Sequence, residues 1–305
     1  MEMSNSKLRN THTQITAGLR QLAKVEGKNP NHVYNRFFRE VFLAELMTID
    51  DGWVIKGGTN LNCILPGARH TKDLDLYRQQ NPTGYLEAAK NLVARMNGTR
   101  VGPYVFKVEH ARQPQNDDGI ENVPLRITAQ IGTRKFLEFW IDVSGDLQVP
   151  PVTSTTTVKR SDDLNIPFVP QTFQILSYPV ENQLADKICA MYEMHEGRAS
   201  TRFRDLYDIT LIALNLEVDS EELALALETQ QRVRKMRLPL RFSHPSNEWA
   251  LRYPRFIKQL GIANEESYDM KVSLDIAEQL FLPILSDQLP SRPMTWSPDN
   301  QKWEQ

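Results

Sequence analysis

The sequence has few cysteines, almost no excess of charge and no long apolar run. Its 305 residues include two cysteines, Cys63 and Cys189, which match neither a zinc-binding pattern nor a disulfide framework. The formal net charge of −2 excludes a global basic field, so any contact with a polyanion must come from a local patch. No run of about 18 apolar residues occurs, which excludes a membrane-spanning helix.

The N-terminus, MEMSNSKLRNTHTQ, also lacks the apolar core of a signal peptide. Two isolated thiols are typical of a protein in a reducing compartment. We therefore expect a soluble cytoplasmic protein with no membrane partner. A composition that is 40% apolar and 24% charged predicts a sizeable core, and the length allows two domains.

The first half of the chain predicts helices followed by an α/β arrangement. Apolar residues at helical spacing predict helices at 9–25 and 31–48. Beyond them we expect strands at 53–55, 73–77, 103–110, 124–131 and 134–143, and helices at 59–65 and 83–97.

The second half changes to helical patterns. We expect helices at 179–195, 202–216, 219–235, 246–260 and 269–286. The domains predicted on this basis are N-terminal helices (1–50), an α/β domain (51–150), a connector (151–178) with one strand near 153–159, an α-helical domain (179–288) and a loosely held tail (289–305).

A glycine pair, Gly57-Gly58, follows the strand expected at 53–55 and opens the next helix. Such a turn lets the backbone approach a phosphate closely, with the N–H groups of the first helical turn directed at it. Most turns of this kind bind nothing, so the pair alone is a weak indication.

Three aspartates strengthen the weak indication that the glycine pair gives. Asp73 and Asp75 lie two apart on an expected strand, which places both carboxylates on one face, where a divalent cation would offset their repulsion. Asp142 interrupts the apolar run FWIDV and would be costly to bury without a partner. Alternatively, Asp73 and Asp75 lie on a strand face that is simply exposed to solvent, and Asp142 caps the turn at 144–145.

The combination is rarer than its parts. A Gly-Gly turn, an Asp-x-Asp strand 15 residues after Gly58 and a third aspartate on a later strand are the components of a two-metal phosphoryl-transfer site. In such a site carboxylates hold Mg²⁺ ions that bridge a triphosphate. We therefore predict that Asp73, Asp75 and Asp142 bind the metal, Mg²⁺ or Mn²⁺.

Four motifs resemble the AbiEii/AbiGii (MenT-like) nucleotidyltransferase toxins. Two lie in the first half, KGGTNL at 56–61 and RHTKDLDL at 69–76. In the second half, PVENQLADKICA at 179–190 resembles the family's helix with an essential lysine, here Lys187. RFRDLYDI at 202–209 resembles its Arg-x-x-Asp-x-x-Asp-Leu helix, whose last aspartate, here Asp208, is catalytically important.

The resemblance implies an α+β fold, with a polymerase-β-like nucleotidyltransferase domain of mixed sheet and flanking helices followed by the α-helical domain. It implies a nucleoside triphosphate (NTP) as substrate, transfer to RNA at the tRNA acceptor end with arrest of translation, a cognate antitoxin and a part in phage defence. The catalytic residues it implies are Asp73, Asp75, Lys187 and Asp208. The nucleotide-binding residues are Lys56, Gly57, Gly58, Thr59, Thr71 and Lys187.

Thr71 is a departure from the family pattern, since some relatives carry there a serine that is phosphorylated to silence the enzyme. The other interpretation is a β-branched residue that enters a strand. For Lys187 we expect a contact with phosphate, although a lysine that only extends along the surface is the alternative. Asp208 is expected to orient Lys187 or the acceptor hydroxyl, and Asp205 to pair with Arg202 or Arg204.

One basic run favours RNA as the acceptor. Five cations lie within ten residues, namely Arg232, Arg234, Lys235, Arg237 and Arg241. These cations would neutralise several phosphates of an RNA. Alternatively, they only interact with the dipole of a helix at its C-terminus, where positive charge is favoured. Two further functions stay open: transfer of a nucleotide to a small molecule or protein, and a catalytically inactive nucleotide-binding module.

Overall fold

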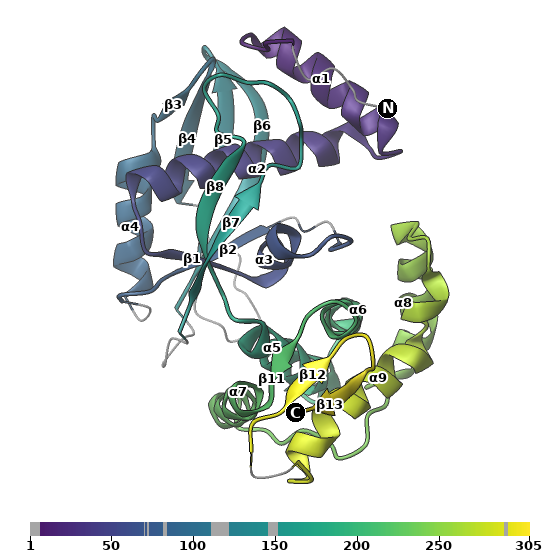
Figure 1. Cartoon of the computed structure of the whole chain (residues 1–305). Helices are drawn as coiled ribbons and strands as arrows, with labels where there is room; N and C mark the ends of the chain where they lie inside the picture. The colour runs from purple at the N-terminus through teal and green to yellow at the C-terminus, as the bar shows by residue number, and fades with distance from the viewer. Residues whose placement is uncertain are drawn as a thin grey trace. The chain divides into compact units, whose positions relative to one another are not determined.

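The computed structural model describes residues 7–69, 71, 73–81, 84–110, 122–145, 152–289 and 292–305. The chain divides into two compact units. Unit 1 contains residues 1–64 and 70–178, and unit 2 contains residues 65–69 and 179–305. The chain therefore passes from one unit to the other three times, and each unit is described by itself (Figure 1).

Unit 1 is built on an eight-stranded sheet in the order β3-β4-β5-β6-β2-β1-β8-β7. Its strands are β1 Trp53–Lys56, β2 Asp73–Arg78, β3 Arg100–Val101, β4 Tyr104–His110, β5 Asn122–Ile131, β6 Arg134–Ser144, β7 Ser154–Lys159 and β8 Thr172–Ser177. The pairs β2–β6 and β1–β8 are parallel, and the other pairs are antiparallel. This mixed sheet confirms the α+β fold that we predicted.

The stretch 151–178 differs from the expected connector because it supplies two strands of the sheet. β7 corresponds to the strand expected near 153–159, whereas the sequence pattern predicts no strand for β8. β8 pairs in parallel with β1, with Val54 opposite Leu176 and Ile55 opposite Ser177. Pairing with a distant strand, which a local pattern does not contain, decides this segment.

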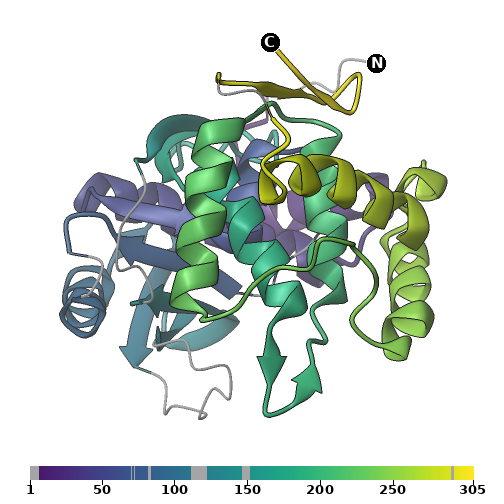
Figure 2. The same ribbon diagram turned by 90° about the horizontal axis from the view of Figure 1, so that it is seen from below.

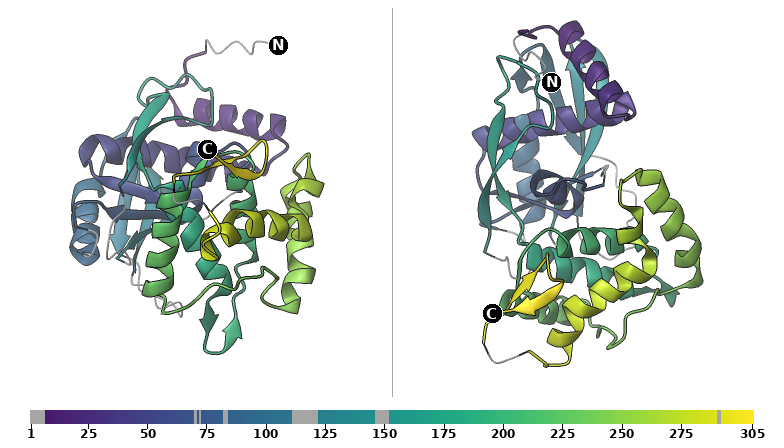
Figure 3. Two further views of the ribbon diagram at one scale, coloured as in Figure 1. Left: turned by 60° about the horizontal axis from the view of Figure 1, so that its bottom comes forward. Right: turned by 45° about the vertical axis from the view of Figure 1, so that its right-hand side comes forward.

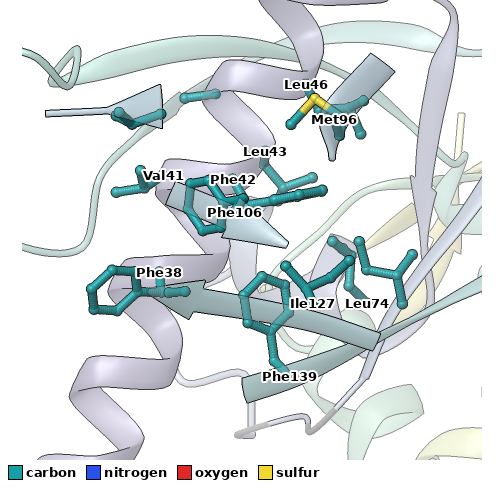
Figure 4. Close-up of a cluster of buried hydrophobic side chains, with 14 of the residues drawn as sticks. Phe38, Val41, Phe42, Leu43, Leu46, Leu74, Met96, Phe106, Ile127 and Phe139 are labelled. Atoms are coloured by element: carbon teal, nitrogen blue, oxygen red, sulfur yellow. The ribbon is translucent and has the colours of Figure 1, made fainter. Parts of the chain in front are cut away.

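Helices cover the face of the sheet that forms the core. The helices of the described part of unit 1 are α1 His12–Val25, α2 Pro30–Ile49, α3 Gly57–Ile64 and α4 Tyr85–Met96. Thr11 and Gln14 form a capping box at the start of α1, and Asn29 caps α2 with Pro30 in its first turn. Figure 4 shows Phe42 and Leu46 of α2 in one cluster with Met96 of α4, Phe106 of β4 and Phe139 of β6.

The alternation of the central strands separates this core from the opposite face. Leu74 and Leu76 of β2 belong to the buried cluster beneath α2, and so do Ile141 and Val143 of β6. Because side chains of a strand point alternately to the two faces, the aspartates between them point away from α2.

Unit 2 is mainly helical. Its helices are α5 Val180–Tyr192, α6 Phe203–Ala213, α7 Ser220–Val233, α8 Asn247–Leu260 and α9 Met270–Leu285, with a short 3₁₀ helix η1 at Glu265–Tyr268. A hairpin of β9 (Met194–His195) and β10 (Arg198–Ala199) extends beyond the helices (Figure 2). None of the helices in the described ranges has the length and apolar character that crossing a membrane requires.

The C-terminal segment is packed, so the expectation of a loosely held tail at 289–305 is wrong for its described residues. β12 (Thr295–Ser297) pairs with β11 (Val218–Asp219) and with β13 (Lys302–Glu304), seen in yellow in Figure 3. The Trp296 side chain is fully buried, and its Nε1 donates to the carbonyl oxygen of Ala213 at 2.8 Å. The prolines of this segment suggested a loose tail, whereas the tryptophan anchors it.

Trp296→Ala is expected to lower the free energy of unfolding by about 3–5 kcal/mol, since it removes a buried aromatic side chain and leaves the Ala213 carbonyl without its donor. Urea denaturation measures the change. Leu225→Ala serves as the control because Leu225 is 61% exposed, and its effect is expected to stay within about 0.5 kcal/mol. Equal effects of the two substitutions would contradict the anchoring role.

Candidate active site

The pairing of β2 with β6 brings the three predicted metal-binding aspartates together in unit 1. Asp75 lies directly opposite Asp142, and Asp73 lies opposite Trp140. Burial, together with the negative charges of Asp75 and Asp73, raises the pKa of Asp142 to about 6. The carboxylates are thus close enough to repel one another, which is the electrostatic setting that a cation would relieve.

Gly57 and Gly58 lie beside these carboxylates. Gly57 is the first residue of α3 and has φ +67°, a left-handed conformation that favours glycine. A Cβ on Gly57 would lie 2.1 Å from Oδ2 of Asp75, and one on Gly58 would lie 3.1 Å from Cβ of Thr71. Neither glycine therefore leaves room for a side chain, so the start of α3 approaches Asp75 and Thr71 closely.

Hydroxyl and amide side chains fix the start of α3 to the sheet. Thr59 Oγ1 donates to the carbonyl oxygen of Asp73 at 3.0 Å, and Thr71 Oγ1 donates to the same oxygen at 3.3 Å. Asn60 is fully buried, where its Nδ2 donates to the Tyr178 carbonyl oxygen at 2.9 Å and its Oδ1 accepts from Ser177 Oγ at 2.8 Å.

Lys56 is also part of this group. It lies opposite Asp75 in the β1–β2 pair, and its Nζ is 5.8 Å from the centroid of the Tyr178 ring. Unit 1 therefore brings together every candidate residue that the sequence assigns to it, namely Lys56, Gly57, Gly58, Thr59, Thr71, Asp73, Asp75 and Asp142.

Arg39 of α2 is a neighbour of the site that the sequence pattern did not identify. It is 6% exposed, and its Nη1 donates to the carbonyl oxygen of Thr71 at 2.6 Å. Burial lowers the pKa of Arg39, while the charges of Glu40 and Asp73 act to raise it. Arg39 thus holds the backbone two residues before Asp73. The only sign of this in the sequence is a charged residue within the apolar stripe of α2.

The donor set fits a hard divalent cation. Three carboxylates supply oxygen ligands of the kind that Mg²⁺ and Mn²⁺ bind, and the absence of a Cβ at Gly57 makes room for Oδ2 of Asp75. Within the described residues, no three acidic, histidine or cysteine side chains are already grouped as ligands around one point.

Unit 2 contains a second group of charged residues, centred on Lys187 of α5. The Nζ of Lys187 lies 2.6 Å from Asp208 Oδ2 and 3.2 Å from Asp205 Oδ1, both on α6. Arg69 binds Asp208 through two hydrogen bonds, of 3.0 Å from Nε and 2.9 Å from Nη2. Arg202 donates to Asp205 at 2.7 Å, which is one of the two pairs that the sequence predicted.

The ion pairs of this group are buried and strongly coupled. Burial alone would lower the pKa of Lys187, but the charges of Asp205 and Asp208 raise it above its usual value. Burial alone would raise the pKa of Asp205, but Lys187 and Arg202 hold it down at about 2. At Lys187 and Asp205 the attraction between opposite charges therefore outweighs the effect of burial.

Arg69 and Asp205 were not identified as site residues from the sequence. Both lie inside the motifs at 69–76 and 202–209, so their signal was the spacing of charged residues around Thr71 and Asp208. The loop before β2 also contacts α6 through Tyr207, whose hydroxyl donates to the Gly67 carbonyl oxygen at 2.7 Å. The segment 65–69 is therefore an integral part of unit 2.

The basic run at 232–241 is divided by the structure. Arg232, Lys235 and Arg237 line one open cavity of about 690 Å³, together with apolar side chains that include Leu238 and Leu240. Arg234 instead forms a close ion pair with Glu193, and Arg241 is exposed outside this cavity. The lining residues are Glu228, Gln231, Arg232, Lys235, Met236, Arg237, Leu238, Leu240 and Leu285.

The chain is similar to a known protein family and to solved structures. A family model described as the nucleotidyl transferase AbiEii toxin of a type IV toxin–antitoxin system matches residues 41–287. Among solved structures, the chain is similar to MenT4, a nucleotidyltransferase toxin from Mycobacterium tuberculosis, with a TM-score of 0.53 and 16% identity over 90% of each chain. It is also similar to JHP933 from Helicobacter pylori, with a TM-score of 0.45 and 16% identity over 84% of this chain and 94% of that one. No curated protein matches the chain in sequence.

Gly57→Ala is expected to impair nucleotide transfer by about a hundredfold, because the new methyl group would displace Asp75. Gly132→Ala is the matched control: Gly132 also has a positive φ, of +57°, but nothing lies within 4 Å of an added Cβ. Both variants should lose about 1–2 kcal/mol of stability through backbone strain. Transfer assays and urea denaturation test this, and equal activity of the two variants would contradict the proximity of Gly57 to a functional Asp75.

Lys187→Met is expected to lower the free energy of unfolding by about 3–5 kcal/mol, since it leaves two carboxylates buried beside Arg69 and Arg202 alone. Lys159→Met is the control, because the Lys159–Asp163 pair is 68% and 71% exposed and should contribute less than about 1 kcal/mol.

The same ion pairs predict a dependence on acid. Since Asp205 has a pKa of about 2 in the folded chain and 3.8 as a free side chain, its stabilising effect is complete above pH 4 and is lost as the pH falls toward 2. Urea denaturation across this range should show the loss in the wild type and less of it in Lys187→Met. A parallel pH dependence in the two proteins would refute the coupling.

Proposed function

Because the chain belongs to the AbiEii family of nucleotidyl transferase toxins, we propose that it transfers nucleotides from an NTP to RNA, at the 3′ acceptor end of tRNA, and so blocks translation. The family match confirms the resemblance described above. The chain is a nucleotidyltransferase and a toxin of a toxin–antitoxin system. Its acceptor, its metal dependence, its effect on translation and its part in phage defence belong to the proposal.

The observation that carries the proposal is the pairing of Asp75 with Asp142 beside the start of α3. We propose that Asp73, Asp75 and Asp142 hold Mg²⁺, which Mn²⁺ could replace. When bound, the metal would offset the negative charge of the triphosphate, of the attacking oxygen and of the leaving oxygen. Asp73 and Asp75 belong to β2, and Asp142 belongs to β6.

The phosphates themselves need donors from the protein. The N-terminal turn of a helix is suited to them, because its N–H groups and dipole favour negative charge. We assign this role to Gly57, Gly58 and Thr59, with Lys56 as a nearby cation and Thr71 as a hydroxyl donor. The glycines matter because a side chain at either position would crowd Asp75 or Thr71 beside the start of α3.

The buried group in unit 2 suggests how Lys187 acts. Its two carboxylates hold Lys187 and Arg69 in fixed positions. We propose that these two cations attract phosphate, with Asp208 as the residue that orients both of them. Arg69 is the more accessible of the two, since its side chain is 17% exposed against 7% for Lys187.

The basic residues that line the cavity favour RNA as the acceptor. Arg232, Lys235 and Arg237 together could neutralise several phosphates, which would make binding depend strongly on salt. The family implies a cognate antitoxin as a second macromolecular partner. Since tRNA is the substrate we propose, we place the activity in the cytoplasm.

The test is to incubate the protein with each labelled NTP, Mg²⁺ and total tRNA. Label is expected on tRNA, and Asp73→Asn or Asp75→Asn should reduce it by about a hundredfold or more, because metal stabilisation of transferred charge is several kcal/mol. Lys187→Ala and Asp208→Ala should also reduce transfer.

Asp163→Asn is the matched control, since Asp163 is an exposed acid of unit 1 with a side chain 71% accessible. It should transfer normally. Label on a small molecule or on protein in place of RNA would support a different acceptor. Absence of label with all four NTPs would contradict the proposed activity, and unchanged transfer by Asp73→Asn would contradict the assigned metal site.

A further inference from the structure

Arg204 in the first turn of α6 lies over two phenylalanine rings. Its guanidinium carbon lies 5.7 Å from the centroid of the Phe203 ring and 5.7 Å from that of the Phe256 ring on α8. The two rings are 5.8 Å apart and meet edge to face. We call Phe203, Arg204 and Phe256 the arginine platform; Figure 1 shows α6 and α8, which carry it.

The rings beneath Arg204 are held rigidly. Phe203 packs against Trp249, which is buried and donates its Nε1 proton to the Ser200 carbonyl oxygen at 2.8 Å. Phe256 packs against Tyr207 at 5.9 Å, and the Tyr207 hydroxyl is itself hydrogen-bonded. A guanidinium resting on such rings has already lost much of its conformational freedom before any ligand arrives.

Arg204 is nevertheless open to a ligand. It is exposed, and no carboxylate among the described residues lies within 4 Å of it. Its neighbour Arg202 differs, because Arg202 is paired with Asp205 at 2.7 Å. Structural ion pairing therefore accounts for Arg202, whereas it does not account for Arg204.

The surroundings of the platform favour a polyanion. Helix α8 carries three basic residues, Arg252, Arg255 and Lys258, against one acidic residue, Glu248, which pairs with Arg252 at 3.3 Å. A planar cation on aromatic rings, with further basic residues on the helix beside it, is suited to a ligand that has both flat rings and phosphates.

We infer that the arginine platform binds the single-stranded 3′ nucleotides of the RNA acceptor by stacking a base on the guanidinium of Arg204. Unstacked bases of single-stranded RNA bind to aromatic rings and arginine planes, whereas bases inside a duplex are covered. The position of Arg204 also supports this, since the same helix carries Asp205 and Asp208 of the Lys187 group. The inference rests on the proposed function, because it assumes that RNA is the acceptor.

The experiment measures binding and transfer with two RNAs, a hairpin with a short single-stranded 3′ overhang and the same hairpin with a blunt end. Fluorescence anisotropy gives Kd, and labelled NTP gives kcat and KM for RNA. Arg204→Ala and Arg204→Lys should each raise Kd and KM for the overhang hairpin by about tenfold, since lysine keeps the charge but not the plane. The KM for NTP and the binding of the blunt hairpin should change little.

Arg198→Ala is the matched control, because Arg198 is an exposed arginine of the β9–β10 hairpin in the same unit. It removes one charge without removing the platform, so its Kd for the overhang hairpin should stay within about twofold of the wild type. Urea denaturation of each variant verifies that the fold is kept.

The outcomes separate this inference from the proposed function. If the wild type labels RNA and the Arg204 variants bind the overhang equally well, the platform is refuted while the proposed function stands. If only Arg204→Ala is impaired, the contact is with phosphate charge and stacking is refuted. If the wild type prefers the overhang through Arg204 but labels no RNA, the platform stands and the proposed function fails.

Discussion

The parallel pairing of β2 with β6 is the constraint on which the candidate metal site depends. Side chains alternate along both strands, so one register places leucine, isoleucine and valine in the core and the three aspartates on the opposite face. A shift by one residue would bury carboxylates in the apolar cluster and expose the leucines. Burying unpaired carboxylates costs so much free energy that this alternative register is strongly disfavoured. The hydrophobic core beneath α2 therefore enforces the same register that gathers the carboxylates, and Asp142 belongs to the group only because of it.

The two units differ in how their charged side chains are arranged. In unit 1 the aspartates are close together, and the pKa of Asp142 is raised to about 6 by burial and by its neighbours. In unit 2 the acids and bases alternate in space, so that the charges of Lys187, Arg69, Asp205 and Asp208 stabilise one another while buried. The first arrangement concentrates negative charge on one face of the sheet, whereas the second balances charge within a buried group.

The family match begins at residue 41, yet structure before that position contributes to the site region. Helix α2 begins at Pro30, and its side chains form much of the core beneath the central strands. Arg39 lies on this helix and contacts the Thr71 carbonyl oxygen at 2.6 Å. Because a buried guanidinium binds a backbone carbonyl strongly only when it is fixed, the packing of α2 and the position of the segment before Asp73 are physically linked. At 16% identity to MenT4, the shared fold says little about such particular contacts.

Local patterns in the sequence sufficed for the helices of both units and for most strands of the sheet, since helical periodicity and strand alternation are short-range properties. They also led to the candidates Gly57, Asp73 and Asp75, whereas Lys187 and Asp208 became candidates through the resemblance of their motifs to a family. Local patterns did not suffice for β8, for the packed segment around Trp296, or for the contacts of Arg39, Arg69 and Arg204. Each of these depends on a partner far away in the chain: β1 for β8, Ala213 for Trp296, Thr71 for Arg39, Asp208 for Arg69 and Phe256 for Arg204. Only the tertiary structure brings such partners within hydrogen-bonding or stacking distance, and so it decides which charged residues are already paired and which can still bind a ligand.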